Sequence, residues 1–325
     1  MSELIIGVDL GGTRIRSALL DQQLKIIKRE ETFTLADEGL EPTLGRIKEM
    51  IRKVLPEDGK VAGIGISAPG PLNPETGVIV HPPNLPGWQD VPLGDILHEE
   101  FGVPIYVGND ANVAVLAEAT LGVAKGYTHA IYLTISTGIG SGMIVDGRLV
   151  LGESGLGAEA GHMIMLVEDR VSSLEEEAAG PDMAAQAVAQ IKNGRQSQIS
   201  DLVDGNLDKV NGKIVGDAAK AGDELALEIV RRAGKIFGLG IINLLLLFNP
   251  SIVVIGGGVA NLGDLIFDPM NEAIRKYTID PAYWRDLKIV APKFGEDVSI
   301  YGAAVLVLTK GGVVDVREVI KQLNK

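Results

Sequence analysis

The sequence predicts an α/β protein built from two domains around a central cleft. Strands and helices alternate along the chain, which is typical of α/β layers. The order strand, glycine-rich turn, strand and helices occurs twice, once in each half. At 325 residues the chain is also too long for one typical hydrophobic core. We therefore expect domains over residues 1–121 and 122–309, and the segment from about residue 310 is open to packing back on the first domain.

The first half begins with three strands. The apolar run of residues 4–8 predicts a buried strand, and turns at 9–13 and 21–23 separate it from strands at 14–20 and 24–33. A helix is expected over residues 40–55, where apolar side chains recur at helical spacing. The half continues with a strand at 61–66, a loop at 69–86, a short helix at 92–101, a strand at 104–107 and a helix at 110–121.

The second half repeats this pattern. A strand at 130–135 leads through a glycine turn at 136–140 into a returning strand at 141–145, and Asp146-Gly147 predicts a hairpin turn. Helices dominate residues 181–248. The half closes with a buried strand at 252–255, a helix from about 261, a strand at 287–290 and a helix from 297 nearly to 309.

Composition excludes several classes of function. Acidic residues number 43 against 30 basic ones, and the net charge of −13 argues against nucleic-acid and anionic-membrane partners. The absence of cysteine excludes disulfides, a cysteine nucleophile and a zinc site built on thiolates. The most apolar stretch, residues 241–248, is far shorter than the roughly 20 residues of a membrane span. We expect no targeting signal, and a cytoplasmic protein.

Two glycine-rich turns are candidate phosphate sites. In Asp9-Leu-Gly-Gly-Thr13, adjacent glycines let backbone N–H groups approach phosphate oxygens, Thr13 adds a hydroxyl, and Arg14 or Arg16 can reach a phosphate. Asp9 supplies a carboxylate suited to magnesium. Taken alone, this turn is more often a plain glycine hairpin in which Asp9 only bonds the turn. The second turn, within residues 133–142, has the same combination of glycines and hydroxyl groups in the other half of the chain. Two such turns together indicate that a polyphosphate binds between them.

Two further stretches follow strands. Gly256, Gly257 and Gly258 come directly after a buried strand, where open α/β sheets bind ligands, but taken alone a tight strand-to-helix turn is the better explanation. In Gly108-Asn-Asp-Ala-Asn112 the polar residues are typical helix N-caps. The same Asp110 is also placed to take a proton from a hydroxyl, with Asn109 holding a neighbouring hydroxyl. Both interpretations can hold at once.

An acidic residue and a histidine lie in a glycine-rich region. Glu159-Ala-Gly-His162 has the spacing of a metal pair on a helix, but the surrounding glycines argue against a helix. A lone histidine is more often structural or exposed. The run Glu175, Glu176 and Glu177 is typical of a solvated helix start.

Together these stretches resemble a known group of kinases. Asp9-Leu-Gly-Gly-Thr13, the Thr137-Gly138 turn and Ile255-Gly-Gly-Gly258 resemble the two phosphate loops and the adenosine loop of the actin-like, hexokinase-like ATPase superfamily. Within it the sequence is similar to the ROK family of sugar kinases. The resemblance runs in family order from residue 8 to about 304, with Ser67-Ala-Pro-Gly-Pro71, Asn84-Leu-Pro-Gly-Trp88, Gly108-Asn-Asp-Ala-Asn112, Ala158-Glu-Ala-Gly-His162, Leu174-Glu175 and Ala179-Gly180.

The resemblance implies two actin-like (ribonuclease H-like) α/β domains and a role for each site residue. Asp110 would be the base that activates the sugar hydroxyl, and Asp9 would serve Mg²⁺, through water. The residues expected to hold the sugar are Gly70, Asn84, Asn109, Asp110, Glu159, His162 and Glu175. Those expected to bind ATP are Asp9, Gly11, Gly12, Thr13, Arg14, Arg16, Thr137 and Gly138 on the phosphate side and Gly257 and Gly258 on the adenosine side.

The sequence departs from the family in one segment. The family commonly continues from its Gly-His motif into a cysteine cluster that binds structural zinc, whereas this chain continues with residues 163–171 and has no cysteine. We therefore expect no structural zinc, with His162 keeping only a sugar-facing role. Some members are repressors with an N-terminal helix-turn-helix. Here the first strand begins at Leu4, and we expect no such domain.

The resemblance implies an ATP- and Mg²⁺-dependent hexose kinase that makes glucose 6-phosphate. Alternatives within the family are kinases of N-acetylhexosamine, mannose or fructose, and polyphosphate is an alternative donor. A catalytically silent sugar-binding regulator is the alternative outside the enzymes. The retained Asp110 and both phosphate turns argue against it. The family also suggests a homodimer.

Overall fold

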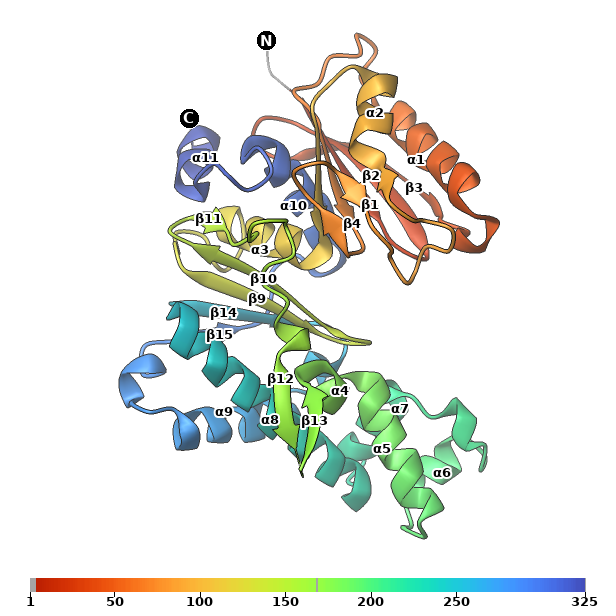
Figure 1. Cartoon of the computed structure of the whole chain (residues 1–325), viewed down its shortest axis with the longest axis vertical. Helices are drawn as coiled ribbons and strands as arrows, with labels where there is room; N and C mark the ends of the chain where they lie inside the picture. The colour runs from red at the N-terminus through yellow and green to blue at the C-terminus, as the bar shows by residue number, and fades with distance from the viewer. Residues whose placement is uncertain (1–3, 168, 325) are drawn as a thin grey trace. The chain divides into compact units, whose positions relative to one another are not determined.

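The computed structural model describes residues 4–167 and 169–324, which form two compact units (Figure 1). Unit 1 takes the described residues up to Tyr132, together with Gly142–Ala158 and the chain from Pro292 onward. Unit 2 comprises Leu133–Ser141 and Glu159–Ala291. The domain boundaries expected at residues 121 and 309 stay a prediction.

Unit 1 is built on a five-stranded sheet with the order β3-β2-β1-β4-β8. Strands β1 (Ile5–Leu10), β2 (Arg14–Leu20) and β3 (Ile26–Phe33) run antiparallel in sequence order, as the two short turns between them require. Strands β4 (Ile64–Ala68) and β8 (Ile105–Asn109) extend the sheet in parallel with β1.

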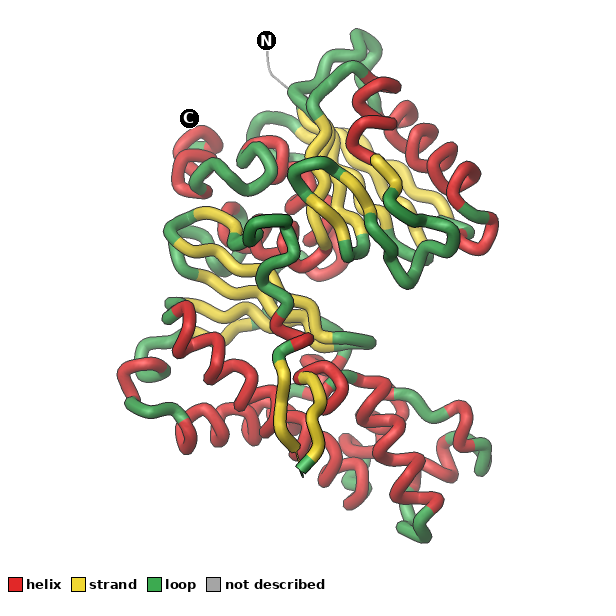
Figure 2. The backbone as a smooth tube through the Cα atoms, in the orientation of Figure 1, coloured by secondary structure: helices red, strands yellow, loops and turns green. Residues whose placement is uncertain are grey.

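Helices cover both faces of this sheet (Figure 2). On one face α1 (Leu40–Val54) and α2 (Leu93–Phe101) contribute side chains to a core with Ile6, Val8 and Ile66. On the other face α10 (Val298–Leu308) packs on β1, β4 and α3 (Asp110–Thr120). A Cβ atom on Gly65 would lie 1.7 Å from the carbonyl oxygen of Ala303, so glycine is what lets α10 approach the sheet.

Unit 1 also contains short elements. The segment expected to be a loop, residues 69–86, contains β5 (Leu72–Asn73) and β6 (Val78–Ile79), which pair with β7 (Val91–Pro92) in a small sheet. Strands of two residues show no alternation from which they could be predicted. The C-terminal helix α11 (Val316–Leu323) belongs to the same unit.

The second five-stranded sheet has the order β11-β10-β9-β14-β15. Its strands are β9 (Ala130–Ile135), β10 (Ile139–Val145), β11 (Arg148–Leu149), β14 (Ile252–Gly256) and β15 (Lys288–Val290), and both β9 and β10 contribute residues to the two units. The strands were expected at these places, because apolar runs and glycine turns mark them in the sequence.

Helices make up most of unit 2. The long apolar α8 (Glu224–Phe248) packs against α4 (Leu174–Ala178), α5 (Gly180–Lys192), α7 (Gly212–Lys220) and α9 (Asp264–Tyr277), and α6 (Gln198–Leu202) packs on α7. Among residues 4–167 and 169–324, no helix has the length and apolar character that crossing a membrane requires.

A hairpin that the sequence did not predict precedes α4. Strands β12 (Ile164–Val167) and β13 (Arg170–Ser173) pair antiparallel within the segment where the family commonly has cysteines. Ile164, Leu166 and Val171 are exposed on it, so its pattern does not show the alternation of a half-buried strand. The acidic run that follows starts α4, as expected.

Candidate active site

The first group of predicted site residues lies where three parallel strands of unit 1 end. Asp9 of β1 is in register with Ser67 of β4, and Ser67 is in register with Gly108 of β8. Asn109 and Asp110 follow directly, at the end of β8 and the start of α3. Because the carboxyl ends of parallel strands are where α/β sheets bind ligands, this edge is the candidate catalytic site.

The glycine turn after β1 is held by backbone and side-chain contacts. The Gly11 N–H group donates to the carbonyl oxygen of Arg14 at 2.9 Å, and the Thr34 hydroxyl donates to the Gly11 carbonyl at 2.6 Å. Gly12 and Thr13 are exposed at the tip. These hydrogen bonds hold the turn in one conformation, in which the Gly12 backbone and the Thr13 hydroxyl group are accessible to a phosphate group.

The two arginines after this turn have different partners. Arg16 donates to Asp9 Oδ2 from Nε at 2.8 Å and from Nη2 at 2.6 Å, so it orients the Asp9 carboxylate. Arg14 is more exposed, lies 5.8 Å from the Phe33 ring centroid and forms an ion pair of 3.5 Å with Glu31. Arg14 is therefore the more accessible of the two arginines, whereas Arg16 is occupied by Asp9.

A predicted sugar residue lies beside the phosphate turn. A Cβ atom on Gly12 would lie 3.1 Å from the Cβ of Asn84, so the backbone of the turn and this side chain are direct neighbours. Leu85 and Trp88 anchor the Asn84 loop because both are buried in the core of unit 1. The fold thus brings together two residues that are 72 positions apart in the sequence.

The expected capping role of Asn109 is confirmed. Its Oδ1 atom accepts a hydrogen bond of 2.7 Å from the Asn112 N–H group, which caps α3. Asp110 Oδ1 accepts 2.8 Å from the Ala111 N–H group. Gly70 is next to this helix start, since its Cβ position would lie 4.0 Å from the Cβ of Asn109. Two predicted sugar residues and the predicted base are therefore adjacent.

Both aspartates at this edge have a raised pKa, and the charge of Asp9 acts on Asp110. Desolvation by the surrounding protein raises the pKa of Asp110, the negative charge of Asp9 raises it further, and the hydrogen bond from Ala111 opposes the shift. Burial also raises the pKa of Asp9, and the charge and hydrogen bonds of Arg16 offset this only in part. A carboxylate with a raised pKa is a stronger base, which suits Asp110 to proton transfer.

The donor set at this edge fits Mg²⁺. Within the described part of the chain, no group of three or more His, Asp or Glu side chains is placed to hold a metal ion. Mg²⁺, however, is usually bound by one or two carboxylates together with water and substrate phosphates. The negative charge of Asp9 raises the pKa of Asp110, and a divalent cation beside Asp9 would offset that charge.

The second glycine turn, in unit 2, contacts Glu175. The Ile139 N–H group donates to Glu175 Oε2 at 2.7 Å. A Cβ atom on Gly138 would lie 2.5 Å from the same oxygen, so only glycine allows this approach without displacing the side chain. Thr137 is exposed at the tip of the turn. One predicted phosphate turn and one predicted sugar residue are thus in direct contact.

The backbone segment that carries Glu159 and His162 lies beside the same turn. Both are exposed at the ends of a short 3-10 turn, Ala160–His162, so the expectation that the surrounding glycines exclude an α-helix is confirmed. A Cβ atom on Gly161 would lie 2.1 Å from the carbonyl oxygen of Ile139. This close approach holds the pair against the Gly138 turn.

The third glycine site completes the group in unit 2. Gly257 has a φ of +95°, and its Cβ position would lie 2.3 Å from the carbonyl oxygen of Ile135. The Gly258 Cβ position would lie 3.8 Å from the Ser136 hydroxyl. The predicted adenosine side therefore adjoins the predicted phosphate turn, because β14 and β9 are neighbours in the sheet.

Three residues that support these groups were missed in the sequence. The Ser141 hydroxyl accepts from the Ala160 N–H group at 2.8 Å, and Ser299 of α10 hydrogen-bonds to Asp9. Burial and the charges of Glu118 and Asp110 raise the pKa of Tyr132 to about 12, so its phenol remains protonated. No local signal marks these residues, since each meets its partner through tertiary structure.

In this α/β fold, carboxylates lie at the ends of strands and glycine-rich turns lie beside them. This combination is typical of α/β proteins that bind phosphate groups. A family model described as the ROK family matches residues 5–310, so this chain belongs to the ROK family. The resemblance inferred from the sequence motifs is thereby confirmed.

Relatives agree with this assignment. A glucokinase from Thermotoga maritima is 35% identical over 319 residues, covering 95% of this chain and 98% of the relative. The crystal structure of a ROK hexokinase from Thermus thermophilus is similar with a TM-score of 0.81 and 33% identity, covering 94% of this chain and 98% of that one. A ROK glucokinase from Streptomyces griseus, solved with glucose and AMPPNP, gives a TM-score of 0.74 and 29% identity over 93% and 98% of the two chains. These likenesses also confirm the predicted actin-like α/β fold class.

Proposed function

We propose that this chain is an ATP-dependent hexose kinase that transfers the γ-phosphoryl group to the 6-hydroxyl of glucose. The observation that carries the proposal is the juxtaposition in unit 1 of Asp110, whose pKa is raised, with Asp9 and the strand end that leads into the glycine turn. The named glucokinases among the relatives support the same reaction, and the AMPPNP complex of one of them supports ATP as the donor.

Asp110 is the proposed general base. Its Oδ1 atom is engaged by the Ala111 N–H group, so Oδ2 is the atom to accept the proton of the sugar hydroxyl. As that proton leaves, the hydroxyl oxygen attacks the γ-phosphorus and the bond to the β-phosphate oxygen breaks, releasing ADP. Catalysis of this kind depends mainly on positioning and on electrostatic stabilisation of the transferred group.

The glycine turns and Asp9 are the proposed phosphate side. The backbone around Gly11, Gly12 and Thr13 provides N–H groups, and Arg16 holds the Asp9 carboxylate in place. Asp9 would hold Mg²⁺ through water, and the cation would neutralise charge on the phosphate oxygens. In unit 2, Thr137 and Gly138 play the corresponding part, with Gly257 and Gly258 on the adenosine side.

Several polar side chains are the proposed sugar ligands. Asn84 and Asn109 in unit 1 and Glu159, His162 and Glu175 in unit 2 offer donors and acceptors for hydroxyl groups. A site that pairs several hydroxyls discriminates strongly against a sugar that lacks one, because its buried polar groups are then left unpaired.

A substrate panel tests the proposal. Purified protein with ATP and Mg²⁺ is assayed for ADP release against glucose, mannose, fructose, N-acetylglucosamine and N-acetylmannosamine, and then with polyphosphate in place of ATP. We expect glucose with ATP to give the highest kcat/KM. ADP release with none of these sugars would overturn the proposal and favour a sugar-binding regulator. We also propose a homodimer, which light scattering of the same sample measures.

A further inference from the structure

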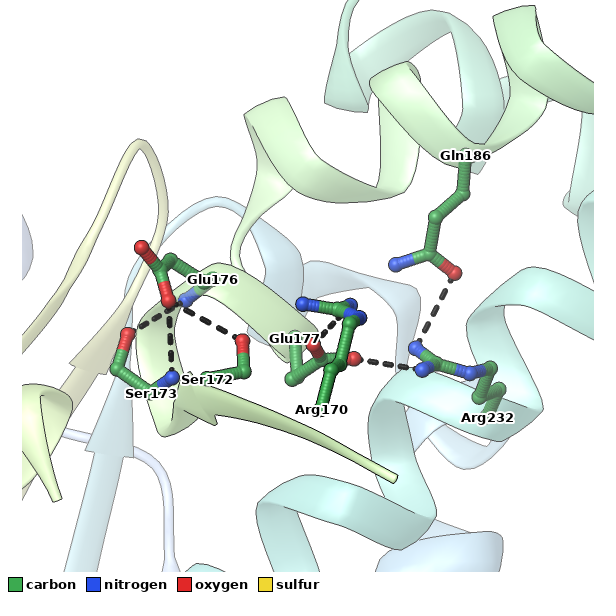
Figure 3. A network of polar contacts seen from close by, with 7 residues as sticks. All are labelled: Arg170, Ser172, Ser173, Glu176, Glu177, Gln186 and Arg232. Atoms are coloured by element: carbon green, nitrogen blue, oxygen red, sulfur yellow. Dashed lines mark hydrogen bonds and ion pairs between the residues drawn. The ribbon is translucent and has the colours of Figure 1, made fainter. Parts of the chain in front are cut away.

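A fully buried carboxylate lies two residues after Glu175. Glu177 has an exposed fraction of 0%, and two arginines from different elements bind it (Figure 3). Arg170 of β13 contacts Oε1, and Arg232 of α8 donates to Oε2 at 2.6 Å. Gln186 of α5 accepts from Arg232 at 3.2 Å. We call Arg170, Glu177 and Arg232 the arginine bridge, which ties the hairpin, α4 and α8 together.

The bridge carries charge rather than a neutral carboxyl group. Burial raises the pKa of Glu177, but the hydrogen bond and charge of Arg232 and the charge of Arg170 oppose that effect, and the pKa lies below its ordinary 4.5. A buried charge is tolerated only when it is paired and hydrogen-bonded. Removing one partner leaves the buried carboxylate incompletely paired, and we expect α4 to shift in response.

The neighbouring glutamate fixes the start of the same helix. The Ser173 hydroxyl accepts from the Glu176 N–H group at 3.1 Å, and Glu176 Oε2 accepts from the Ser173 N–H group at 3.0 Å and from the Ser172 hydroxyl at 3.1 Å (Figure 3). This capping box and the arginine bridge hold α4 from the side of the hairpin.

The opposite side of α4 is attached to the second glycine turn. Glu175 accepts from the Ile139 N–H group at 2.7 Å, and the Gly180 N–H group, just after α4, donates to the carbonyl oxygen of Ser136 at 2.8 Å. Both bonds end on the turn that contains Thr137 and Gly138. A displacement of α4 therefore moves Glu175 and strains this turn.

We propose that the arginine bridge is a positioning device for the kinase reaction, setting where Glu175 meets the sugar and how the Thr137-Gly138 turn meets the phosphates. The expected effect of the bridge on activity rests on the proposed function, because it assumes that the chain phosphorylates a sugar. Arg170, Glu177 and Arg232 touch no substrate in this account and are positioning residues that act through Glu175 and the turn. An ion pair that only stabilises the fold would leave the geometry around Ile139 unchanged.

The main test is Arg170→Met, alone and combined with Glu175→Gln. The Arg170 side chain is 57% exposed, so methionine is tolerated there without loss of the fold. We expect kcat/KM for glucose to fall about tenfold in the wild-type background, because small misplacements of positioning groups are costly. In the Glu175→Gln background we expect a smaller further loss than in the wild-type background, since the part of the effect that passes through Glu175 is already absent and only the part that passes through the Gly180–Ser136 bond remains.

The matched control is Arg195→Met. Arg195 and Glu228 form an exposed ion pair of 3.0 Å in the same unit, with side chains 43% and 63% exposed. Exposed pairs contribute little, so we expect kcat/KM within about twofold of the wild type. A loss by the same factor in both Glu175 backgrounds, or an Arg170→Met enzyme equal to the control, would overturn the inference.

Hydrogen exchange at the Ile139 amide provides a readout that needs no catalysis. We expect faster exchange in Arg170→Met and in Glu177→Gln than in the wild type and Arg195→Met, because the bond to Glu175 is weakened. If Glu177→Gln fails to fold, the exchange rate of the Ile139 amide in Arg170→Met is the test. Faster exchange in Arg170→Met, together with a wild type that phosphorylates none of the sugars, would support the bridge while refuting the proposed function. Unchanged exchange in folded Arg170→Met would refute the bridge.

Discussion

At the scale of single residues, the site depends on close approaches that only small groups permit. Gly12 lies against Asn84, Gly138 against Glu175 and Gly257 against the backbone of Ile135. The sequence singled out all three glycines as candidates because glycine-rich turns follow strands in both halves of the chain. It did not identify what each glycine touches, since Asn84 and Glu175 lie 72 and 37 positions from their partners.

Gly138→Ala tests the approach to Glu175. The added Cβ atom would lie 2.5 Å from Glu175 Oε2, so the carboxylate must move and its bond to the Ile139 N–H group must weaken. We expect KM for glucose to rise by about tenfold while the protein stays folded. Steady-state kinetics at saturating ATP measure this.

Gly45→Ala is the matched glycine control for that change. Gly45 lies inside α1 with nothing within 4 Å of its Cβ position. Alanine there should stabilise the helix by about 0.5–1 kcal/mol and leave KM unchanged. A Gly138→Ala enzyme with the same KM as this control would mean that Glu175 does not contact the sugar.

At the scale of elements, the β12–β13 hairpin and α4 are the parts of the fold that the sequence predicted least well. The run of three glutamates correctly predicted a helix start, but the expected solvated face is wrong for Glu177, which is buried. The reason is long-range, because Arg232 arrives from a helix 55 positions away. The hairpin was not predicted since its exposed apolar residues, among them Ile164 and Leu166, break the polar and apolar alternation.

The stability contributed by Glu177 should depend on pH with a definite sign. Its pKa is lower in the folded chain than the ordinary 4.5, so the contribution is full above that value and is lost as the pH falls through the folded pKa. At pH 7 we expect Glu177→Gln to lower the free energy of unfolding by on the order of 2 kcal/mol, less than for a fully buried pair because both arginines are partly exposed.

Calorimetry of both proteins over a pH range measures this dependence. The difference in Tm between the wild type and Glu177→Gln should be several degrees at pH 7 and should shrink as the pH falls from 4.5 through the lower pKa of the folded chain. A difference that stays constant over this range would mean that the charge of Glu177 does not contribute.

At the scale of the whole molecule, the order of motifs predicted more than any motif alone. Each glycine turn had an ordinary structural explanation, yet the family model matches residues 5–310, nearly the whole chain. The strands at 14–20 and 130–135 and the helix that starts at Asp110 were predicted with their bounds, because turns and caps mark them. Supports such as Ser299 and Tyr132 were not, since they come from segments distant in the sequence.

Metal removal tests which cation the whole molecule requires. The chain has no cysteine, and among the residues that the structure describes no group of three or more His, Asp or Glu side chains is placed to hold a metal ion, as a closed tetrahedral zinc site requires. We expect chelation to abolish activity, Mg²⁺ alone to restore it fully, and elemental analysis to find no stoichiometric zinc. One tightly bound zinc per chain, or a need for zinc to regain activity, would contradict this expectation.

The central claim is that Asp110 activates the sugar hydroxyl, and the most direct measurement compares wild type and Asp110→Asn in a glucose 6-phosphate assay with glucose titrated by calorimetry. Asparagine is nearly isosteric but cannot accept the proton, and loss of a general base typically costs about 10² to 10⁴ in rate. We predict a fall in kcat of that size with glucose affinity largely retained. A variant whose kcat stays within about threefold of the wild type would contradict the account.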